Sequence, residues 1–127
     1  MRRVFKTRYF GRWMRKTELT DHVLCGAVTE MARGLVDADL GGGVVKKRVA
    51  MPGRGKSGSA RTLVATNRGD RWFFVFGFEK NERDNVSPKE LRTLQIIAAD
   101  LLTLASDQLA AQVANEALLE ICHDSTQ

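Results

Sequence analysis

The stretch RTLVATNRGDRWFFVFGF, residues 61–78, decides the fold. Residues 61–66 and 71–78 are rich in β-branched and aromatic side chains, and Asn67-Arg68-Gly69-Asp70 between them is typical of a hairpin turn. Residues 72–76 are apolar at every position, which predicts a central strand covered on both faces. We therefore expect a β-hairpin in the middle of a sheet.

The sequence before the hairpin predicts one strand and two helices. Residues 4–9 alternate as a strand does, and Phe10 and Trp13 suit the packed side of a short helix. Thr20 is a suitable N-cap for a longer helix, and Gly34 suits its C-terminal end. The apolar stripe expected on that helix consists of Leu19, Val23, Ala27, Met31 and Leu35.

The remaining segments complete an α+β pattern. We expect residues 41–43, three glycines, to form a flexible hinge before a strand over 44–49, and residues 50–59 to form a loop. Ser87, followed by Pro88 and Glu90, has the signature of a capping box at a helix start. The expected apolar positions of this helix are Leu91, Leu94, Ile97, Ala98, Leu101 and Leu102. A final helix starting at Ser106 is expected to carry Leu109, Val113, Leu118 and Ile121.

This order of elements, β, α, α, β, β, β, α, α, predicts a small antiparallel sheet with helices packed on it. The chain has 127 residues, of which 43% are hydrophobic and 28% charged, as in one globular domain. Residues 1–92 carry all 20 lysines and arginines, whereas residues 93–127 carry five acidic residues and neither Lys nor Arg. Within a single domain we therefore distinguish residues 1–105 from an acidic C-terminal helix and tail, residues 106–127.

The two cysteines, Cys25 and Cys122, lie far apart and fit neither a metal-binding nor a disulfide pattern. Cys25 falls on the apolar side of a predicted helix, so we expect a buried free thiol and a reducing, cytoplasmic setting. No stretch approaches the ~18 consecutive apolar residues of a membrane span. The basic N-terminus lacks serine and alternates as a strand does, which argues against a transit peptide.

Common catalytic motifs are not found in the sequence. Gly55-Lys56-Ser57 is similar to part of a phosphate-binding P-loop, but that motif needs a glycine where Ala50 stands, and a strand follows instead of a helix. His22 and His123 are solitary, so neither a metal site nor a histidine-dependent catalytic arrangement is expected. We predict no metal and no cofactor.

The remaining candidate for function is a set of basic side chains around the hairpin. In the strand before it, Lys47 shares a face with two valines and is expected to meet the core, whereas Lys46 and Arg48 point to the opposite face. The cations expected to share one groove are Lys46, Arg48, Arg61, Lys80 and Arg83. Together they favour a polyanion as ligand, whereas Arg54 and Lys56 alone are explained as ordinary loop charge.

These residues resemble the RelE/HigB-type toxins of bacterial type II toxin–antitoxin systems. The resemblance rests on GLVDADLGGGVVKKR at 34–48, Arg61-Thr-Leu, and GFEKNERDN at 77–85, the most specific of the three. It covers roughly residues 3–105. It implies a RelE-like toxin fold, cleavage of mRNA, usually on the translating ribosome, and neutralisation by a cognate antitoxin, for which we expect a helix-turn-helix protein.

In the better-known members of this family, lysines and arginines cleave the RNA together with a tyrosine and without a metal, and the 2′-hydroxyl attacks the adjacent phosphate. The predicted catalytic residues are Lys46, Arg61, Lys80 and Arg83. The predicted RNA-binding residues are Lys47, Arg48, Lys56, Phe78 and Asn81. Asn81 stands where some members have an arginine, and Ser87 falls near the tyrosine position, so the general acid is unassigned.

Charge suggests a role for each catalytic candidate. Lys46 is the candidate base or electrostatic anchor, because neighbouring cations lower the pKa of a lysine. The planar guanidinium of Arg61 suits the scissile phosphate and its transition state. Lys80 or Arg83 would neutralise the leaving 5′-oxygen. Phe78 could stack on a base, although we favour core packing for it.

Two other functions stay open from the sequence. A non-catalytic inhibitor would bind RNA or the ribosome with the same cations, and its affinity would fall steeply with salt. A relative of the ParE-type toxins, which act on DNA gyrase, would share the fold without needing the basic groove. The last helix also has alternative interpretations: packing on the sheet, which we favour, contact with the antitoxin, or shielding of the groove.

Overall fold

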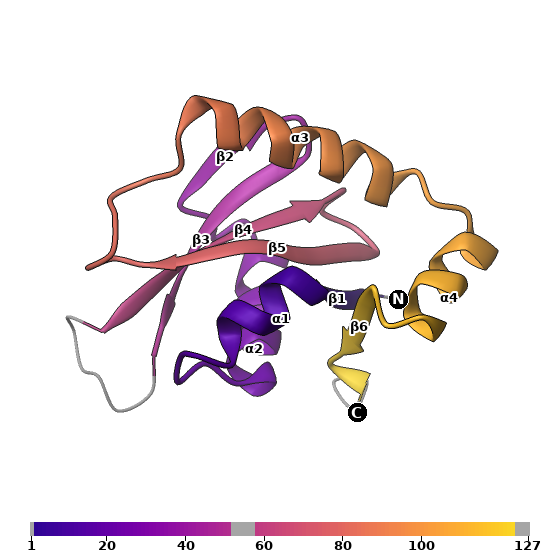
Figure 1. Cartoon of the computed structure of the whole chain (residues 1–127), viewed down its shortest axis with the longest axis horizontal. Helices are drawn as coiled ribbons and strands as arrows, with labels where there is room; N and C mark the ends of the chain where they lie inside the picture. The colour runs from indigo at the N-terminus through magenta and orange to yellow at the C-terminus, as the bar shows by residue number, and fades with distance from the viewer. Residues whose placement is uncertain (1, 52–57, 124–127) are drawn as a thin grey trace.

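The computed structural model describes residues 2–51 and 58–123. They form a six-stranded sheet in the order β2-β3-β4-β5-β1-β6, with helices on both faces (Figure 1). The strands are β1 (Arg3–Thr7), β2 (Ala38–Gly41), β3 (Val44–Ala50), β4 (Ser59–Thr66), β5 (Arg71–Glu79) and β6 (Leu118–Ile121). The helices are α1 (Arg8–Met14), α2 (Asp21–Ala32), α3 (Pro88–Leu102) and α4 (Ser106–Ala114).

The β1–β5 pair of this sheet is parallel, and the other four described pairs are antiparallel. The predicted α+β class with helices on a mainly antiparallel sheet is therefore confirmed. The parallel pair joins the first strand in the chain, β1, to β5, the second strand of the hairpin, and the two run in the same direction. Since β5 has β4 on one side and β1 on the other, the apolar hairpin strand is internal, as its sequence predicts.

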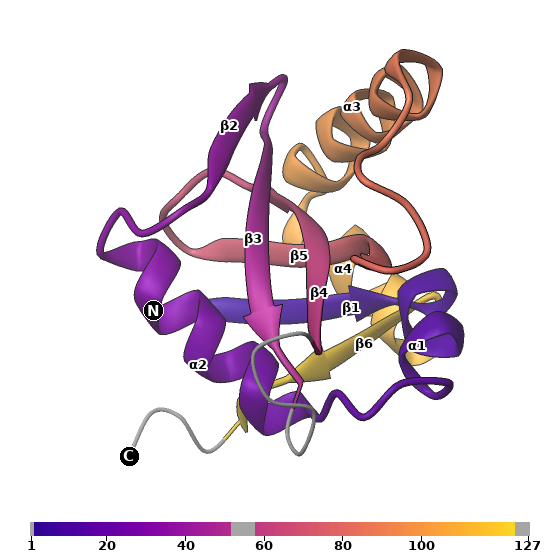
Figure 2. The same ribbon diagram turned by 90° about the vertical axis from the view of Figure 1, so that its left-hand side faces the viewer.

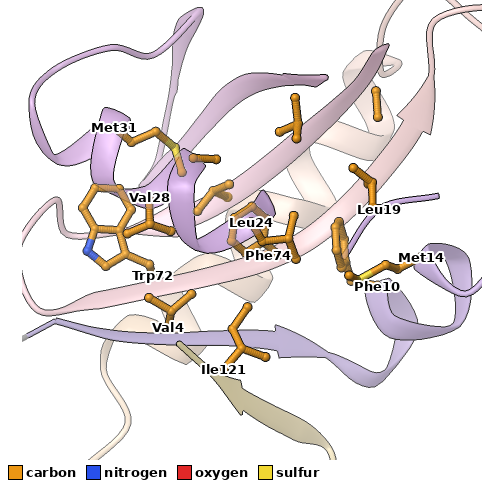
Figure 3. Packing of buried hydrophobic residues seen from close by; sticks show 14 of the residues in the cluster. Val4, Phe10, Met14, Leu19, Leu24, Val28, Met31, Trp72, Phe74 and Ile121 are labelled. Carbon is orange, nitrogen blue, oxygen red and sulfur yellow. The ribbon is translucent and has the colours of Figure 1, made fainter. Parts of the chain in front are cut away.

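Two hydrophobic clusters hold the helices on the sheet, one on each face. Figure 2 shows α2 and α3 on opposite sides of β3 and β4. In the first cluster Leu24 and Phe10 lie over Phe74, with ring centroids of the two phenylalanines 5.5 Å apart (Figure 3). In the second, which includes Leu94 and Ala98 of α3, Phe5 stacks on Phe73 with ring centroids 5.0 Å apart. Because each buried aromatic side chain stabilises the fold by about 1.5–3 kcal/mol, β5 is its main packing element.

Local signals in the sequence form the expected caps. The Ser87 hydroxyl accepts a hydrogen bond from Glu90 N at 3.1 Å, and the Glu90 carboxylate accepts one from Ser87 N at 2.8 Å, so the capping box is confirmed. Thr20 caps α2 through Val23 N, also as predicted. The turn over residues 67–70 joins β4 to β5, with Arg68 at φ 64°.

Two short edge strands differ from the predictions. The glycines at 41–43 are not a hinge: all three have positive φ, and they turn the chain between β2 and β3. The last helix ends at Ala114, and residues 118–121 form β6 against β1 instead of continuing it. The spacing of three between Leu118 and Ile121 suits one face of a helix, whereas in β6 the two side chains lie on opposite faces of the sheet, Leu118 in the second cluster and Ile121 in the first. The available edge of β1 therefore overrides the helical spacing.

Two boundaries also shift. Thr7 accepts a hydrogen bond from Phe10 N and starts α1, so Arg8 and Tyr9 belong to a helix and not to the first strand. The buried face of α2 consists of Leu24, Ala27, Val28 and Met31. The predicted stripe was therefore partly wrong, and Leu35 at its end is 58% exposed.

The prediction of a free Cys25 is wrong, because Cys25 forms a disulfide with Cys122, with their Cα atoms 5.7 Å apart. The strand β6 runs antiparallel to β1 and brings Cys122 beside Cys25 of α2. The two cysteines are 97 residues apart in the sequence, and their spacing alone does not predict that they pair. The expected reducing setting rested partly on unpaired thiols and loses that support. Within residues 2–51 and 58–123, no helix alone is long and apolar enough to cross a membrane.

Candidate functional site

The strand β3 separates its basic side chains between the two faces of the sheet. Lys47 lies among Val45 and Val49 under α2 and is only 9% exposed. Its ammonium group lies 2.8 Å from a Glu30 carboxylate oxygen and donates to Leu35 O at 2.9 Å. These contacts hold Lys47 against α2, and its predicted RNA contact stays a prediction.

The opposite face of β3 brings two arginines together. Arg48 is paired with Arg61 across the β3–β4 ladder, and Arg61 in turn is paired with Phe78 on β5. Directly paired residues of antiparallel strands project to the same face, about 5 Å apart at their Cα atoms. Lys46 lies on this face too, opposite Leu63. The structure thus brings Lys46, Arg48 and Arg61 together, as the alternation of β3 predicts.

These cations have few compensating groups. The guanidinium of Arg61 donates to Ser59 Oγ at 3.0 Å, and the Asp37 carboxylate accepts a hydrogen bond from the backbone of Arg48, not from its guanidinium. In the part of the chain that the structure describes, no carboxylate forms an ion pair with Lys46, Arg48, Arg61 or Lys80. Within the described ranges these side chains therefore concentrate positive charge without an ion-paired carboxylate of their own, although the Asp37 carboxylate lies at the Arg48 backbone.

A hollow of about 750 Å³ lies where the ends of β3 and β4 approach α2. Arg48, Arg61 and Lys80 line it, together with Lys47 and the carboxylate residues Glu30 and Asp37. Lys80 reaches it because its backbone N donates to Ser59 O at 3.3 Å, which holds the start of the turn after β5 beside β4. Asn81 follows in the same turn and is exposed. Lys56, predicted to bind RNA, lies outside the described residues.

Arg83 is held differently from the other cations. Its guanidinium carbon lies 5.5 Å from the ring centroid of Phe76 and 5.7 Å from that of Phe78, and one nitrogen lies 2.6 Å from Glu90 Oε1. The hydrogen bond from Arg83 lowers the pKa of Glu90, helped by one from the backbone of Ser87, and the same contact raises the pKa of Arg83. Arg83 is thus a fixed cation over an aromatic surface.

Phe78 is 3% exposed and packs in the second cluster, so the structure favours core packing over the predicted contact with a base. A different aromatic residue is exposed on this side of the sheet. Tyr9 is 60% exposed and stacks on Phe76, with ring centroids 6.0 Å apart and an interplanar angle of 9°. The sequence does not identify Tyr9 as a site residue, because the alternation over residues 4–9 predicts one strand; the signal for a helix there is Thr7, a suitable N-cap.

The site offers hydrogen-bond donors and positive charge, which suit a phosphate-rich ligand. Among residues 2–51 and 58–123, no group of three or more His, Cys, Asp or Glu side chains is placed to hold a metal ion.

Two comparisons with known proteins bear on this arrangement. A family model described as the RelE toxin of the RelE/RelB toxin–antitoxin system matches residues 2–121, which include every described strand and helix. No curated protein matches the sequence significantly.

Proposed function

Because the chain belongs to the RelE toxin family and is thus the toxin of a toxin–antitoxin system, with a cognate antitoxin as its partner, we propose that it is an endoribonuclease. Its substrate is mRNA, cut on the translating ribosome without a metal ion. The place of action is then the cytoplasm, and the antitoxin is a helix-turn-helix protein.

One observation carries the proposal: Arg48 and Arg61 face each other across β3 and β4 with no carboxylate paired to either side chain among the described residues. Like charges directly opposite in a ladder destabilise it, by roughly 0.2–1 kcal/mol. An RNA phosphate between the two guanidinium groups would remove this repulsion and satisfy both planar forks. Such an arrangement supports anion binding better than a purely structural role.

Cleavage follows from placing the scissile phosphate at this pair. The 2′-oxygen of the preceding ribose forms a bond to phosphorus as its proton passes to Lys46, and the bond from phosphorus to the 5′-oxygen breaks. The products are a 2′,3′-cyclic phosphate and a 5′-hydroxyl, whose oxygen takes up a proton as it leaves. Arg48 and Arg61 stabilise the charge that develops on the non-bridging oxygens. Lys46, on the same face, is the proposed base or anchor, and Lys80 neutralises the leaving 5′-oxygen. Arg83, fixed by Glu90, contributes a constant positive field.

The test compares Arg61→Ala with Arg92→Ala, which removes an exposed arginine of α3 that is not on the sheet. Losing one electrostatic donor typically lowers the rate by about 10²–10³-fold, so Arg61→Ala should abolish growth inhibition on induction while Arg92→Ala retains it. Both variants should keep the circular dichroism spectrum of the wild type. Undiminished toxicity of Arg61→Ala would sink the assignment.

Mapping mRNA 5′ ends after induction separates the nuclease from the alternatives. Cuts within translated codons that disappear with Arg61→Ala support the proposal. Intact mRNA with arrested translation would instead indicate a non-catalytic inhibitor that uses the same cations for phosphate contacts. DNA damage with intact mRNA would indicate a gyrase-directed toxin.

A further inference from the structure

A groove of about 470 Å³ lies beside the cationic face, between α1 and the first turns of α3. Figure 1 shows these two helices on opposite sides of β5. Val75 and Phe76 of β5 line it, together with Tyr9 on one side and Glu90, Leu94 and Ile97 of α3 on the other. Its size is in the range of small-ligand sites, and its lining is mainly apolar with a few polar groups. We call it the Tyr9 groove.

Exposed apolar side chains are concentrated at this groove. In the described part of the chain, four large hydrophobic side chains are exposed, and Tyr9 and Ile97 line the groove. The ring of Tyr9 lies nearly parallel to that of Phe76 and leaves much of its surface open. Phe76 thus fixes the orientation of an aromatic surface that the protein itself does not cover. A flat apolar ligand would fit against it.

Charge connects the groove to the proposed RNA site. Phe76 contacts Tyr9 and also lies under Arg83, whose partner Glu90 lines the groove. The β3 strand that carries Arg48 is two strands away from β5, which is about 10 Å at normal strand spacing. Neighbouring nucleotides of one RNA strand can bridge such a distance. The occupant should therefore combine an aromatic ring with anionic groups.

We propose that the Tyr9 groove binds one nucleobase of the RNA whose phosphates lie at Arg48 and Arg61, with the base stacked on Tyr9. This inference rests on the proposed function and adds a subsite to it. Stacking on an aromatic side chain is tolerant of base identity, because every base presents a flat π-face. The subsite would thus position the strand for cleavage without selecting one sequence.

The probe is a short single-stranded RNA with 2′-O-methyl groups, which cannot be cut because the attacking hydroxyl is blocked. Tyr9→Ala should raise its Kd by about 5- to 150-fold, the range found for loss of one base–aromatic stack. Tyr9→Phe retains the ring and should change the Kd by less than about twofold. A series of the same RNA, each with one abasic nucleotide at a different position, locates the base. The wild type should bind one member of the series more weakly than the intact RNA, whereas Tyr9→Ala should bind all members as it binds the intact RNA.

Filling the groove gives a second, independent variant. Ile97→Trp should weaken binding, whereas Ile96→Trp, on an exposed residue of α3 outside the groove lining, should leave it unchanged. Thermal melting of each variant checks that the fold is retained.

The outcomes separate the subsite from the function. If Arg61→Ala weakens binding and Tyr9→Ala does not, the subsite is refuted and the RNA site stands. If Tyr9→Phe is as damaging as Tyr9→Ala, the hydroxyl acts and stacking is refuted. If the wild type binds the RNA no better than Arg61→Ala does, the proposed function fails and the subsite fails with it.

Discussion

Reduction of the Cys25–Cys122 bond is expected to lower thermal stability strongly. The bond joins residues 97 positions apart, so it restricts most of the unfolded chain. For a loop of about 100 residues, the chain-entropy model gives about 4.7 kcal/mol, and measured disulfides more often contribute 2–4 kcal/mol. For a domain of this size, 1 kcal/mol corresponds to roughly 3–5 °C in Tm. We therefore expect reduction to lower Tm by roughly 6–24 °C.

Differential scanning calorimetry with and without a thiol reductant measures this shift, and thiol labelling of the denatured protein reports whether the bond was formed. Cys122→Ser should melt at the temperature of the reduced wild type and should not respond to the reductant. Two results would refute the reasoning: free thiols in the protein purified without reductant, or a bond that is present but changes Tm by less than about 1 °C.

Three further predictions follow from other contacts. Arg48→Gln should stabilise the protein by roughly 0.2–1 kcal/mol, because it removes the repulsion by Arg61, and urea titration measures this gain. The same substitution should weaken RNA binding and reduce the salt dependence of the Kd by about one phosphate contact, which Kd values at several salt concentrations measure. The hydrogen bond from Arg3 lowers the pKa of Glu120, so the ionised carboxylate should stabilise the fold fully above its unfolded pKa of ~4.3, and this contribution should be lost as the pH falls through the folded pKa. The Tm of Glu120→Gln should therefore fall less on acidification than the Tm of the wild type. Gly77→Ala would place a methyl carbon 2.4 Å from the Trp13 ring and should lower the free energy of unfolding by about 1–3 kcal/mol, measured by chemical denaturation. Gly69→Ala is the control, because a methyl carbon there meets only ordinary contacts, and equal stability of the two variants would contradict the packing argument.

The parts of the fold that sequence predicts are those set by neighbouring residues. The capping box at Ser87, the turn over residues 67–70 and the apolar strand β5 each depend on a few consecutive side chains. The edge strands β2 and β6 are not predicted from the sequence, because each has only four residues, too few for the periodicity of apolar residues to distinguish a strand from a helix. Their pairing with β3 and β1, and the disulfide beyond β6, depend on tertiary contacts.

The candidate site shows the same division. Alternation along β3 predicts that Lys46 and Arg48 lie on one face of the sheet and Lys47 on the other. Pairing with β4 then places Arg61 on the face of Lys46 and Arg48. The exposed stack of Tyr9 on Phe76 could not be predicted, because α1 places Tyr9 beside a strand 67 residues later in the chain. Ring orientation across such a separation has no signal in local sequence.

The Glu90 carboxylate serves two structures at once, because its Oε1 atom accepts hydrogen bonds from the backbone of Ser87 and from the side chain of Arg83. The beginning of α3 and a cation of the proposed site therefore order each other, and fraying of the helix end would release the cation. Ligand binding at the cationic face should in turn slow hydrogen exchange at the first-turn amides of α3, although these amides lie on another element. Residue 90 is also constrained by both partners: aspartate would be one methylene too short for the pair of contacts, and glutamine would keep the cap while removing the charge that holds Arg83.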